Sequence, residues 1–575
     1  MGIKHFFIWF KKNYGECITT IHNNNEYFSD SDVEIDNLCL DLNGIIHPCA
    51  QKVYEYGDHK PNQKRLLKKI KKRGLKWQIK LFQTVCDKID YYRRLVNPKK
   101  RLILCIDGVA GFAKMNQQRQ RRFRSAMESS EDMDFNTVSI TPGTSFMNYL
   151  SKYIDWYIRM MITNVPEWRD IEIVFSNEKV AGEGEHKIIN YMRKYSTISE
   201  SYCIQGLDAD LIMLSSGMLH PNMYILRENH YNRSELYFLN ISLFNEKLAQ
   251  NMRWEKTETS SRYSAKSAID DFIFMCFLVG NDFVPTIPTL AILEGGIDVM
   301  IDVYKRVGEN YGHLTRCRKG KDVALRPKAL SVFLGELSTY EKGLLDEKQD
   351  KKDCFQPDAI LNKHTKINEG KSDVNFEEYK KDFYDKKFGE SGYSIEEICH
   401  QYLEGLQWVI TYYKKGNPNW NWYFKHFYAP FLCDLSKYSE TFKCVNFELG
   451  EPVNPFIQLL CVMPPQAVDL LPKPLQPIIL SPASSVYNNY PMEFDIDMSG
   501  KRREWEGLVL LPMIDVGKVR EEYEKYSKEL DKRDLSIISN SDHYLYFYNS
   551  RKNYFFKSFY GDVTDCSCSR RVIEF

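Results

Sequence analysis

Four short apolar segments in the first 220 residues constrain the fold of this chain more than any other feature. They are NLCLDLNG, RLILCIDG, IEIVFSNE and SYCIQGLDADLIML, at residues 37–44, 101–108, 171–178 and 201–214. Each is a nearly continuous apolar run of strand length, which is typical of a parallel strand buried on both faces. Helical patterns lie between them, at 76–95 and 145–163. This alternation predicts an α/β fold built on a parallel sheet.

Acidic residues fall at the ends of successive apolar elements: Asp41, Asp107, Glu183, Glu185, Asp208, Asp210 and Asp282. Ligands of open parallel sheets bind beyond the carboxyl ends of the strands, so we expect these side chains to gather at one edge. A single acid after a strand is more often a helix cap or a turn residue. The joint pattern predicts a metal site, and an all-oxygen site suits Mg²⁺ or Mn²⁺.

The charge of the chain is strongly uneven. The net charge is only +1, yet residues 52–124 hold 22 Lys and Arg against 5 Asp and Glu. Such polarity is expected of a protein that binds a polyanion on one face, although a solvated basic helix is the alternative. Within this segment, helical spacing places four side chains on one face: Lys114, Gln118, Arg121 and Arg122. Three cations and an amide beside the acidic edge predict a phosphate pocket.

Composition divides the chain into three parts, for which we predict boundaries of 1–335, 336–395 and 396–575. Residues 341–395 are charged and polar, and we interpret them as an exposed linker or a partly ordered insertion. The part after residue 402 is rich in aromatic residues. Fifteen scattered cysteines predict a reduced, intracellular compartment, and no apolar run reaches the roughly 18 residues that span a bilayer.

The order of motifs along the chain is distinctive. The chain resembles the 5′→3′ exoribonuclease (XRN) family, within the wider flap-endonuclease and PIN-like nuclease superfamily. The segments that carry the resemblance include MGIKHFF, DNLCLDLNGIIHPC, IDGVAGFAKMNQQRQRRFR, GEGEHKI, GLDADLIML, GNDFVP, YLEGLQWVITYYKKG, WNWYFKHFYAPF and GKRREWEGLVLLP. The resemblance implies a nuclease core with a twisted parallel sheet flanked by helices. It also implies a second, aromatic-rich region that packs on this core and completes the active-site pocket.

The resemblance implies a role for each candidate residue. The seven acids resemble the family's catalytic carboxylates, which hold two Mg²⁺ ions that Mn²⁺ can replace. Lys114, Gln118, Arg121 and Arg122 resemble its 5′-monophosphate pocket. His47, in GIIHPC, resembles the histidine that stacks on the terminal base, and Trp422 is our choice for the facing tryptophan, with Trp420 and Trp505 as alternatives.

The chain also departs from the family pattern. The family usually has Pro-Arg where this chain has Gly111-Phe112, so one cation of the phosphate side is missing. The chain ends within about 60 residues of the second region, whereas the large cytoplasmic members continue into several small β domains. We therefore expect a minimal form of the family.

The expected activity is processive, Mg²⁺-dependent 5′→3′ degradation of single-stranded RNA with a 5′-monophosphate, as in the decay of decapped mRNA. The expected products are nucleoside 5′-monophosphates, and the expected partners are RNA and the decapping machinery, with no membrane. We expect a cytoplasmic monomer, with a nuclear location as the alternative. Two other readings use the same acids: a structure-specific flap endonuclease, and an inactive RNA-binding scaffold.

Overall fold

The computed structural model describes the chain apart from residues 1–2, 4, 23–32, 60–73, 129–134, 230–231, 233–234, 256–260, 352–353 and 390. The first residues of the MGIKHFF motif and the most basic part of the 52–124 segment therefore lie outside the described residues. Across the ranges that are described, no helix is both long and apolar enough to cross a membrane.

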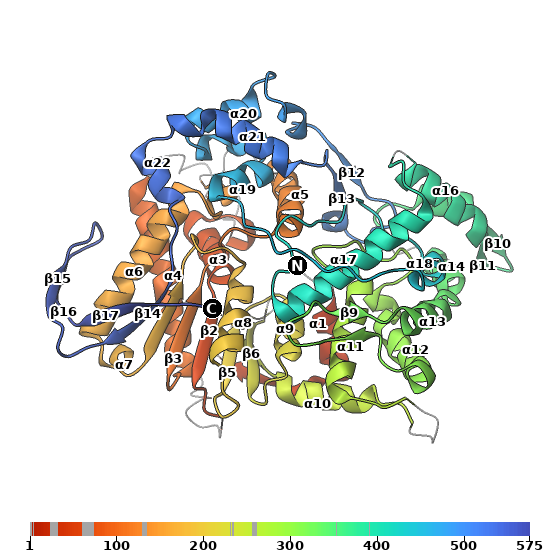
Figure 1. Ribbon diagram of the computed structural model, residues 1–575, viewed down its shortest axis with the longest axis horizontal. Helices are drawn as coiled ribbons and strands as arrows, with labels where there is room; N and C mark the ends of the chain where they lie inside the picture. The colour runs from red at the N-terminus through yellow and green to blue at the C-terminus, as the bar shows by residue number, and fades with distance from the viewer. Residues whose placement is uncertain are drawn as a thin grey trace.

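A nine-stranded sheet forms the centre of the described part of the molecule (Figure 1). In spatial order its strands are β1 (Ile18–His22), β7 (Glu235–Asn240), β6 (Met223–Glu228), β5 (Tyr202–Gln205), β2 (Asn37–Asp41), β3 (Arg101–Cys105), β4 (Glu172–Ser176), β14 (His543–Tyr548) and β17 (Cys568–Ile573). The central strands from β6 to β4 are parallel, and the outer strands pair antiparallel. The carboxyl ends of β5, β2, β3 and β4 therefore share one edge of the sheet.

Alternate residues of the central strands enter two different cores. Leu38 and Leu40 of β2 pack with α3 (Asn43–Tyr54), α4 (Leu75–Val96) and α6 (Ser145–Asn164) on one face. Cys39 points to the other face, where α8 (Gly184–Tyr195), α9 (Asp210–Met218), α10 (Ile241–Asn251) and α11 (Ala265–Leu278) pack. Burial on both faces explains why these strands are almost wholly apolar in sequence.

The predicted parallel sheet is confirmed, with one change in its last strand. The predicted strands at 37–44, 101–108 and 171–178 correspond to β2, β3 and β4, and the predicted helices at 76–95 and 145–163 correspond to α4 and α6. The apolar run at 201–214 is not a single strand, because it divides into β5 and α9. The residues between them, Gly206 to Ala209, form the turn that carries Asp208.

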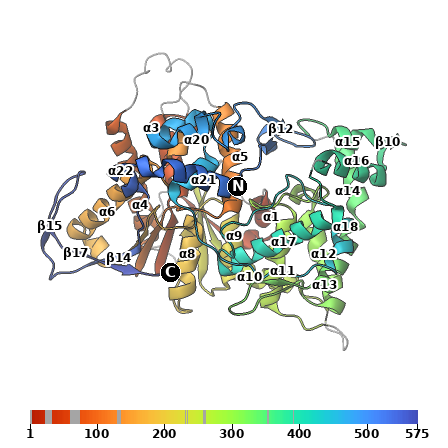
Figure 2. The same cartoon turned by 45° about the horizontal axis from the view of Figure 1, so that its top comes forward.

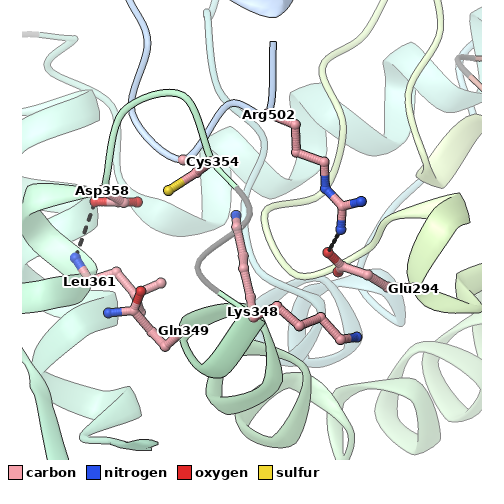
Figure 3. Close-up of a pocket in the computed structure, with 9 residues that line it drawn as sticks. Glu294, Lys348, Gln349, Cys354, Asp358, Leu361 and Arg502 are labelled. Carbon is pink, nitrogen blue, oxygen red and sulfur yellow. Dashed lines mark hydrogen bonds and ion pairs between the residues drawn. The ribbon is translucent and has the colours of Figure 1, made fainter.

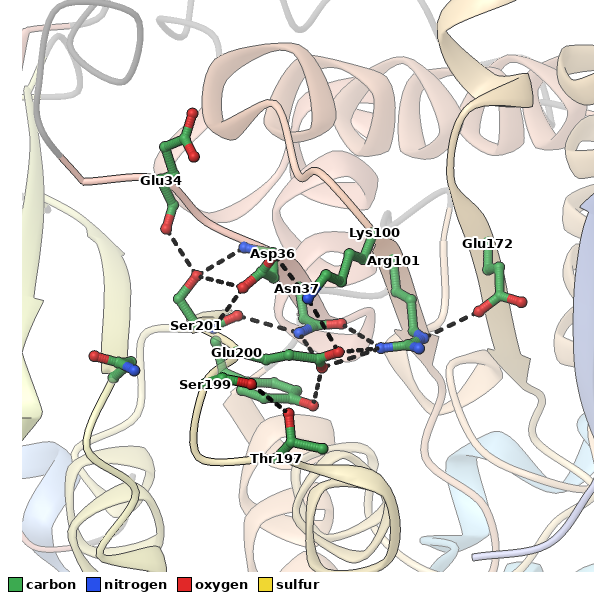
Figure 4. A network of polar contacts seen from close by, with 12 residues as sticks. Glu34, Asp36, Asn37, Lys100, Arg101, Glu172, Thr197, Ser199, Glu200 and Ser201 are labelled. Carbon is green, nitrogen blue, oxygen red and sulfur yellow. Dashed lines mark hydrogen bonds and ion pairs between the residues drawn. The ribbon is translucent and has the colours of Figure 1, made fainter.

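The amino ends of the strands, opposite the acidic edge, are joined by a polar network (Figure 4). Glu200 accepts hydrogen bonds from Arg101 (3.1 Å), Asn37 (3.0 Å) and the hydroxyl of Tyr202 (3.0 Å). Arg101 also pairs with Glu172 of β4 at 3.0 Å. The network holds β5, β2, β3 and β4 in a fixed register relative to one another. This register determines where the carboxyl ends of the four strands lie.

The C-terminal residues complete the sheet of the first region. β14 pairs antiparallel with β4, with Leu545 opposite Val174, and β17 pairs with β14. Antiparallel strands at the edge of a sheet are exposed on one face, so polar and apolar residues alternate in HYLYFY and CSRRVI. This alternation makes the two strands hard to recognise in the sequence. These two strands are therefore a structural part of the core sheet.

Residues 336–395 are an insertion with a core of its own rather than an exposed linker. They form α14 (Glu341–Lys351), α15 (Ala359–Lys363), the hairpin β10–β11 (Thr365–Asn368 and Lys371–Val374) and α16 (Phe376–Phe388). Leu345, Tyr379 and Phe383 are buried together with Ile398 and Phe431 of the following region. The apolar residues of this insertion are few and mostly aromatic, so the charged composition of the segment does not indicate a core. The boundaries at 335 and 395 stay a prediction.

A third core carries the basic helix α5 (Phe112–Glu128). Its apolar side, with Phe112, Met115 and Phe123, packs on α19 (Pro455–Val462) and α21 (Val516–Tyr526). Figures 1 and 2 show α5 beside α21, next to the carboxyl edge of the sheet. The second region therefore fixes the orientation of α5 relative to the sheet.

Candidate active site

Each acid predicted from the sequence stands at the end of an element near the carboxyl edge of the sheet. Asp41 is the last residue of β2, and Asp107 lies two residues beyond β3. Asp208 is in the turn after β5, and Asp210 is the first residue of α9. Glu183 is the N-cap of α8, and Glu185 is the second residue of that helix. Asp282 lies in the loop after α11.

The electrostatics of these carboxyl groups show that they lie together. Burial raises the pKa of Asp41 well above its ordinary value, and the charges of Asp107 and Asp208 raise it further. Burial raises the pKa of Asp210 to about 7, with further contributions from Asp282 and Asp208. The pKa of Glu185 is also raised well above its ordinary value, by burial and then by Asp210. The structure thus concentrates negative charge that a cation would relieve.

Gly184, between the two glutamates of GEGE, allows the carboxylates to approach α8. A Cβ atom at this position would lie 2.6 Å from Asp41 Oδ1 and 3.3 Å from Asp107 Oδ1. The Gly184 N–H donates to Asp107 Oδ1 at 2.6 Å. Any larger residue here would displace the two aspartates, so glycine is required at this point of the site.

Lys114, at the start of α5, lies among the acids. Its Nζ is 2.7 Å from Glu183 Oε2 and 2.8 Å from Asp282 Oδ2. Burial lowers the pKa of Lys114, but Asp282 and Glu183 raise it by more, so it stays well above its ordinary value. The sequence predicts Lys114 in the phosphate pocket, whereas in this structure its ion pairs are with two of the acids, Glu183 and Asp282.

The donor set fits a hard divalent cation, since it consists of carboxylate oxygens whose mutual repulsion is only partly offset by Lys114. Across the described ranges, no three Asp, Glu, His or Cys side chains are arranged closely enough to hold one metal ion. The ammonium of Lys114 instead bridges Glu183 and Asp282. Metal binding by the seven acids therefore stays a prediction, and in this structure the Lys114 ammonium lies between two of them.

The second half of α5 carries two arginines, Arg121 and Arg122, whose charges act on His47 of α3. Burial, and to a smaller extent the charge of Arg121, lowers the pKa of Arg122 to about 9. The Arg122 Nη1 and the Gln118 Oε1 are buried and have no hydrogen-bond partner among the described residues. Burial and the charges of Arg121 and Arg122 lower the pKa of His47 to about 3. A buried arginine beside another cation favours an anionic ligand.

Two tyrosines of α17 (Ile395–Lys415) complete the acidic site from the second region. The Tyr412 hydroxyl donates to Glu183 Oε1 at 2.5 Å, and the Tyr413 hydroxyl donates to Asp210 Oδ2 at 3.1 Å. The sequence analysis missed both. The available signal was the pair of adjacent tyrosines inside an apolar helix, because a buried tyrosine hydroxyl needs a partner.

Lys187 is a third residue that the sequence analysis missed. Its Nζ donates to the carbonyl oxygens of Ile106 and Asn177, each at 2.8 Å. Burial lowers the pKa of Lys187 to about 8, while nearby thiol and carboxyl groups such as Asp107 raise it. The amine thus ties α8 to the ends of β3 and β4, and it holds the backbone next to Asp107.

The three candidate tryptophans occupy different surroundings. Trp422 stacks on Trp408 with ring centroids 4.9 Å apart, and its Nε1 donates to Glu404 at 2.8 Å. The backbone oxygen of Trp420 accepts from the N–H of Phe112, the first residue of α5, at 2.8 Å. Trp505 is 60% exposed. The stacking role of Trp422 stays a prediction, with Trp420 and Trp505 as the alternatives.

Comparison with known proteins agrees with the motifs. The family description "XRN 5'-3' exonuclease N-terminus" matches residues 1–229, and "Xrn1 helical domain" matches residues 262–378 and 375–569. A 5'-3' exoribonuclease 2 homolog of Drosophila melanogaster is 28% identical over 96% of this chain and 74% of its own length. The 5'-3' exoribonucleases 1 of Saccharomyces cerevisiae and Homo sapiens are 27% and 29% identical over 98% and 97% of this chain.

The chain spans only 46% of the yeast relative and 36% of the human one. A solved structure, the catalytic core of Rad2 in complex with DNA substrate, covers 61% of this chain at 12% identity with a TM-score of 0.30, too low to support an argument. The two family descriptions account for most of the sequence, including the parallel strands of the sheet, α5 and α17. The chain therefore belongs to the XRN 5′→3′ exonuclease family.

Proposed function

We propose that this protein is a divalent-metal-dependent 5′→3′ exoribonuclease that removes nucleotides from single-stranded RNA with a 5′-monophosphate. The observation that carries the proposal is the course of α5. Lys114, near its first residue, contacts the acids, and Arg121 lies seven residues further on, about 10 Å along the helix axis. One helix thus carries both the lysine that contacts the acids and the arginines that we propose bind the terminal phosphate of the RNA.

In the proposed complex, Arg121, Arg122 and Gln118 hold the 5′-phosphate. Guanidinium groups bind phosphate oxygens through two parallel hydrogen bonds, and the phosphate would relieve the repulsion between the two arginines. His47 is neutral at physiological pH because its pKa is lowered to about 3 by burial and by these arginines. Its ring could then stack on the first base without reading the sequence.

The seven acids are the residues that would hold the metal, proposed as two Mg²⁺ ions that Mn²⁺ can replace. When bound, such ions activate water and stabilise the charge on the leaving oxygen. Tyr412 and Tyr413 fix the orientation of Glu183 and Asp210 through their hydroxyl groups. Lys114 can exchange one carboxylate partner for a substrate phosphate, because it stands between the acids and the cationic pocket.

This arrangement supports a processive cycle. Each hydrolysis that releases a nucleoside 5′-monophosphate leaves a new 5′-monophosphate on the RNA, which suits the same pocket again. A cap or a triphosphate carries more bulk and charge than this pocket would accept. The proposed substrates are therefore decapped or cleaved RNAs. The decapping machinery, a monomeric state and a cytoplasmic location, with a nuclear one as the alternative, belong to the same proposal.

The test uses one RNA sequence with a 5′-monophosphate, a 5′-triphosphate or a 5′-hydroxyl group, incubated with Mg²⁺ or with EDTA. We expect mononucleotide products from the monophosphate RNA alone, and none in EDTA. Asp208→Ala should abolish hydrolysis while RNA binding survives. Oligonucleotide fragments from a DNA flap would indicate a flap endonuclease instead, and binding without products in any metal would indicate an inactive scaffold.

A further inference from the structure

Two cations beside the acids, Lys187 and Arg227, take no part in the proposed function. Lys187 belongs to α8 and is 2% exposed, and Arg227 belongs to β6 and is half-buried. Removing a cation from water costs free energy unless hydrogen bonds compensate for the lost hydration. Burial lowers the pKa of Arg227 to about 10, while the charge of Asp208 raises it. The partners of these two side chains therefore indicate what the cations contribute.

Lys187 holds two backbone carbonyl groups, and each of them is next to an acid. Its Nζ donates to the carbonyl oxygen of Ile106 and to that of Asn177, each at 2.8 Å. Ile106 immediately precedes Asp107, and Asn177 immediately precedes Glu178, which lies two residues beyond β4. One ammonium group thus fixes the chain where it leaves β3 and where it leaves β4.

Arg227 makes the same kind of contact at β5. Its guanidinium group donates to the carbonyl oxygen of Leu207, in the turn after β5, and Leu207 immediately precedes Asp208. Strand β6 holds the backbone of this turn as well, because the N–H of Gly206 donates to the carbonyl oxygen of Leu226 at 3.1 Å. Two of the seven acids therefore follow a carbonyl group that a cation of a neighbouring element holds.

The side chain of Arg227 is itself held in place by an aromatic ring. Phe7 belongs to α1 (Phe6–Asn13), and the Arg227 Cζ lies 4.4 Å from the centroid of its ring. Phe7 packs in turn on Tyr237 of β7, with ring centroids 5.7 Å apart. A guanidinium group over an aromatic face is attracted to it, which restricts the positions that Arg227 can adopt.

Neither cation pairs directly with a carboxylate in the part of the chain that the structure describes. The hydrogen bonds of Lys187 and Arg227 go to carbonyl oxygens. Arg502, by contrast, pairs with Glu294 at 2.6 Å beside a small pocket (Figure 3). A cation that is held by carbonyl groups supplies positive charge near the acids, and it leaves the carboxylate oxygens available to a metal ion.

We propose that Lys187 and Arg227 are positioning residues, which hold Asp107 and Asp208 through the backbone in the orientation that binds a divalent cation. Contacts that orient metal ligands from outside typically contribute 10- to 100-fold to metal affinity or activity. The proposal rests on the proposed function, since it requires a metal ion at the acids.

The proposal predicts a direction that a purely electrostatic role would reverse. If the two cations contributed only their charge, their removal would tighten the binding of Mg²⁺, because less positive charge would oppose it. If they position the acids, their removal weakens the binding of Mg²⁺. The sign of the change therefore distinguishes the two roles.

The test measures Mg²⁺ binding by titration calorimetry, without RNA, for the parent protein, Lys187→Met, Arg227→Met and Arg227→Lys. Methionine keeps an unbranched side chain but has neither a charge nor a hydrogen-bond donor. We expect both methionine variants to bind Mg²⁺ on the order of ten-fold more weakly than the parent. Arg227→Lys should keep most of the affinity, since it keeps a cation that can donate to the same carbonyl oxygen. If Lys187→Met does not fold, the two variants of the less buried Arg227 decide the question.

Arg159→Met is the matched control, because Arg159 is 7% exposed and pairs at 3.0 Å with Asp155, which is not one of the seven acids. It should lower the melting temperature, since it leaves a carboxylate without its cation, and it should leave Mg²⁺ affinity unchanged. Unchanged Mg²⁺ affinity of Arg227→Met would overturn the proposal and assign Arg227 to stability alone. Tighter binding would also overturn it, since that result indicates a role of charge only. Absence of Mg²⁺ binding by the parent protein would be a different result, which rejects the metal at the acids and the positioning role together.

Discussion

Arg122 illustrates a conflict between stability and binding at the scale of one residue. Burial and the nearby charge of Arg121 lower its pKa to about 9, which means that the folded protein holds this charge at a cost. The buried Nη1, which has no hydrogen-bond partner among the described residues, adds to that cost. Such a residue is expected where a ligand supplies the missing partner.

We therefore predict that Arg122→Met raises the melting temperature of the free protein by a few degrees while it weakens selection of the 5′ end. The methionine fills similar space without a buried charge. Each charge-assisted hydrogen bond that is lost should reduce the preference for 5′-monophosphate over 5′-hydroxyl RNA by about 1.5–3 kcal/mol. Thermal unfolding and the ratio of kcat/KM for the two RNAs measure these effects.

Arg571→Met, at an exposed position of β17, is the control and should change neither quantity. A lower melting temperature for Arg122→Met, with an unchanged preference, would assign Arg122 to the structure of α5 instead of the pocket.

Helix α17 shows how one element of the second region controls the acids of the first. A column of rings runs from Trp422 through Trp408 to Tyr412 and then to His186 of α8, with centroids 4.9, 5.0 and 3.8 Å apart. Within this column, the Tyr412 hydroxyl donates to Glu183. The position of Glu183 therefore depends on packing more than 200 residues away in sequence.

We predict that Tyr412→Phe and Tyr413→Phe raise the Mg²⁺ concentration needed for half-maximal activity and leave the KM for RNA nearly unchanged. Each substitution removes a hydroxyl that orients a carboxylate, which typically costs 10- to 100-fold in metal affinity or activity. Titration calorimetry of Mg²⁺ binding provides a measurement that does not depend on turnover. Tyr384→Phe is the control, because its buried hydroxyl donates to Asp434 at 2.9 Å, a carboxylate that is not one of the seven acids. Normal Mg²⁺ binding by both variants would reject this role.

The acids were predictable from sequence because a strand that ends in an aspartate is a local pattern. Asp41 and Asp107 follow runs that are apolar at every position, and that composition identifies buried parallel strands. Asp210 was located correctly even though the run around it divides into β5 and α9, since the edge of the sheet is the same in either case.

Other parts of the site depend on packing between distant segments, which a single sequence does not reveal. Tyr412 and Tyr413 look like ordinary core residues until α17 is placed against the acids. Lys114 has the helical spacing of the phosphate pocket, yet its contacts are with Glu183 and Asp282 because α5 begins at the acidic edge. The strands β14 and β17 have an alternating pattern that does not indicate which sheet they join.

For the whole molecule, these long-range contacts predict cooperative unfolding despite the length of 575 residues. One buried core joins residues as distant as Phe6, Ile204, Leu406 and Leu545. We expect thermal unfolding followed by tryptophan fluorescence and by circular dichroism to give one coincident transition. Two separated transitions would indicate that the first region is stable without the second.

The pairing of β14 with β4 has a consequence for how the protein is made. Ser176 of β4 and His543 of β14 are in contact although they are 367 residues apart. At a synthesis rate of about 5–20 residues per second, roughly 20–70 s pass between the emergence of the two strands. Throughout that interval the edge of β4 is open, and an open strand edge invites pairing with other chains. A nascent chain of this protein therefore depends on protection by chaperones until its final strands arrive.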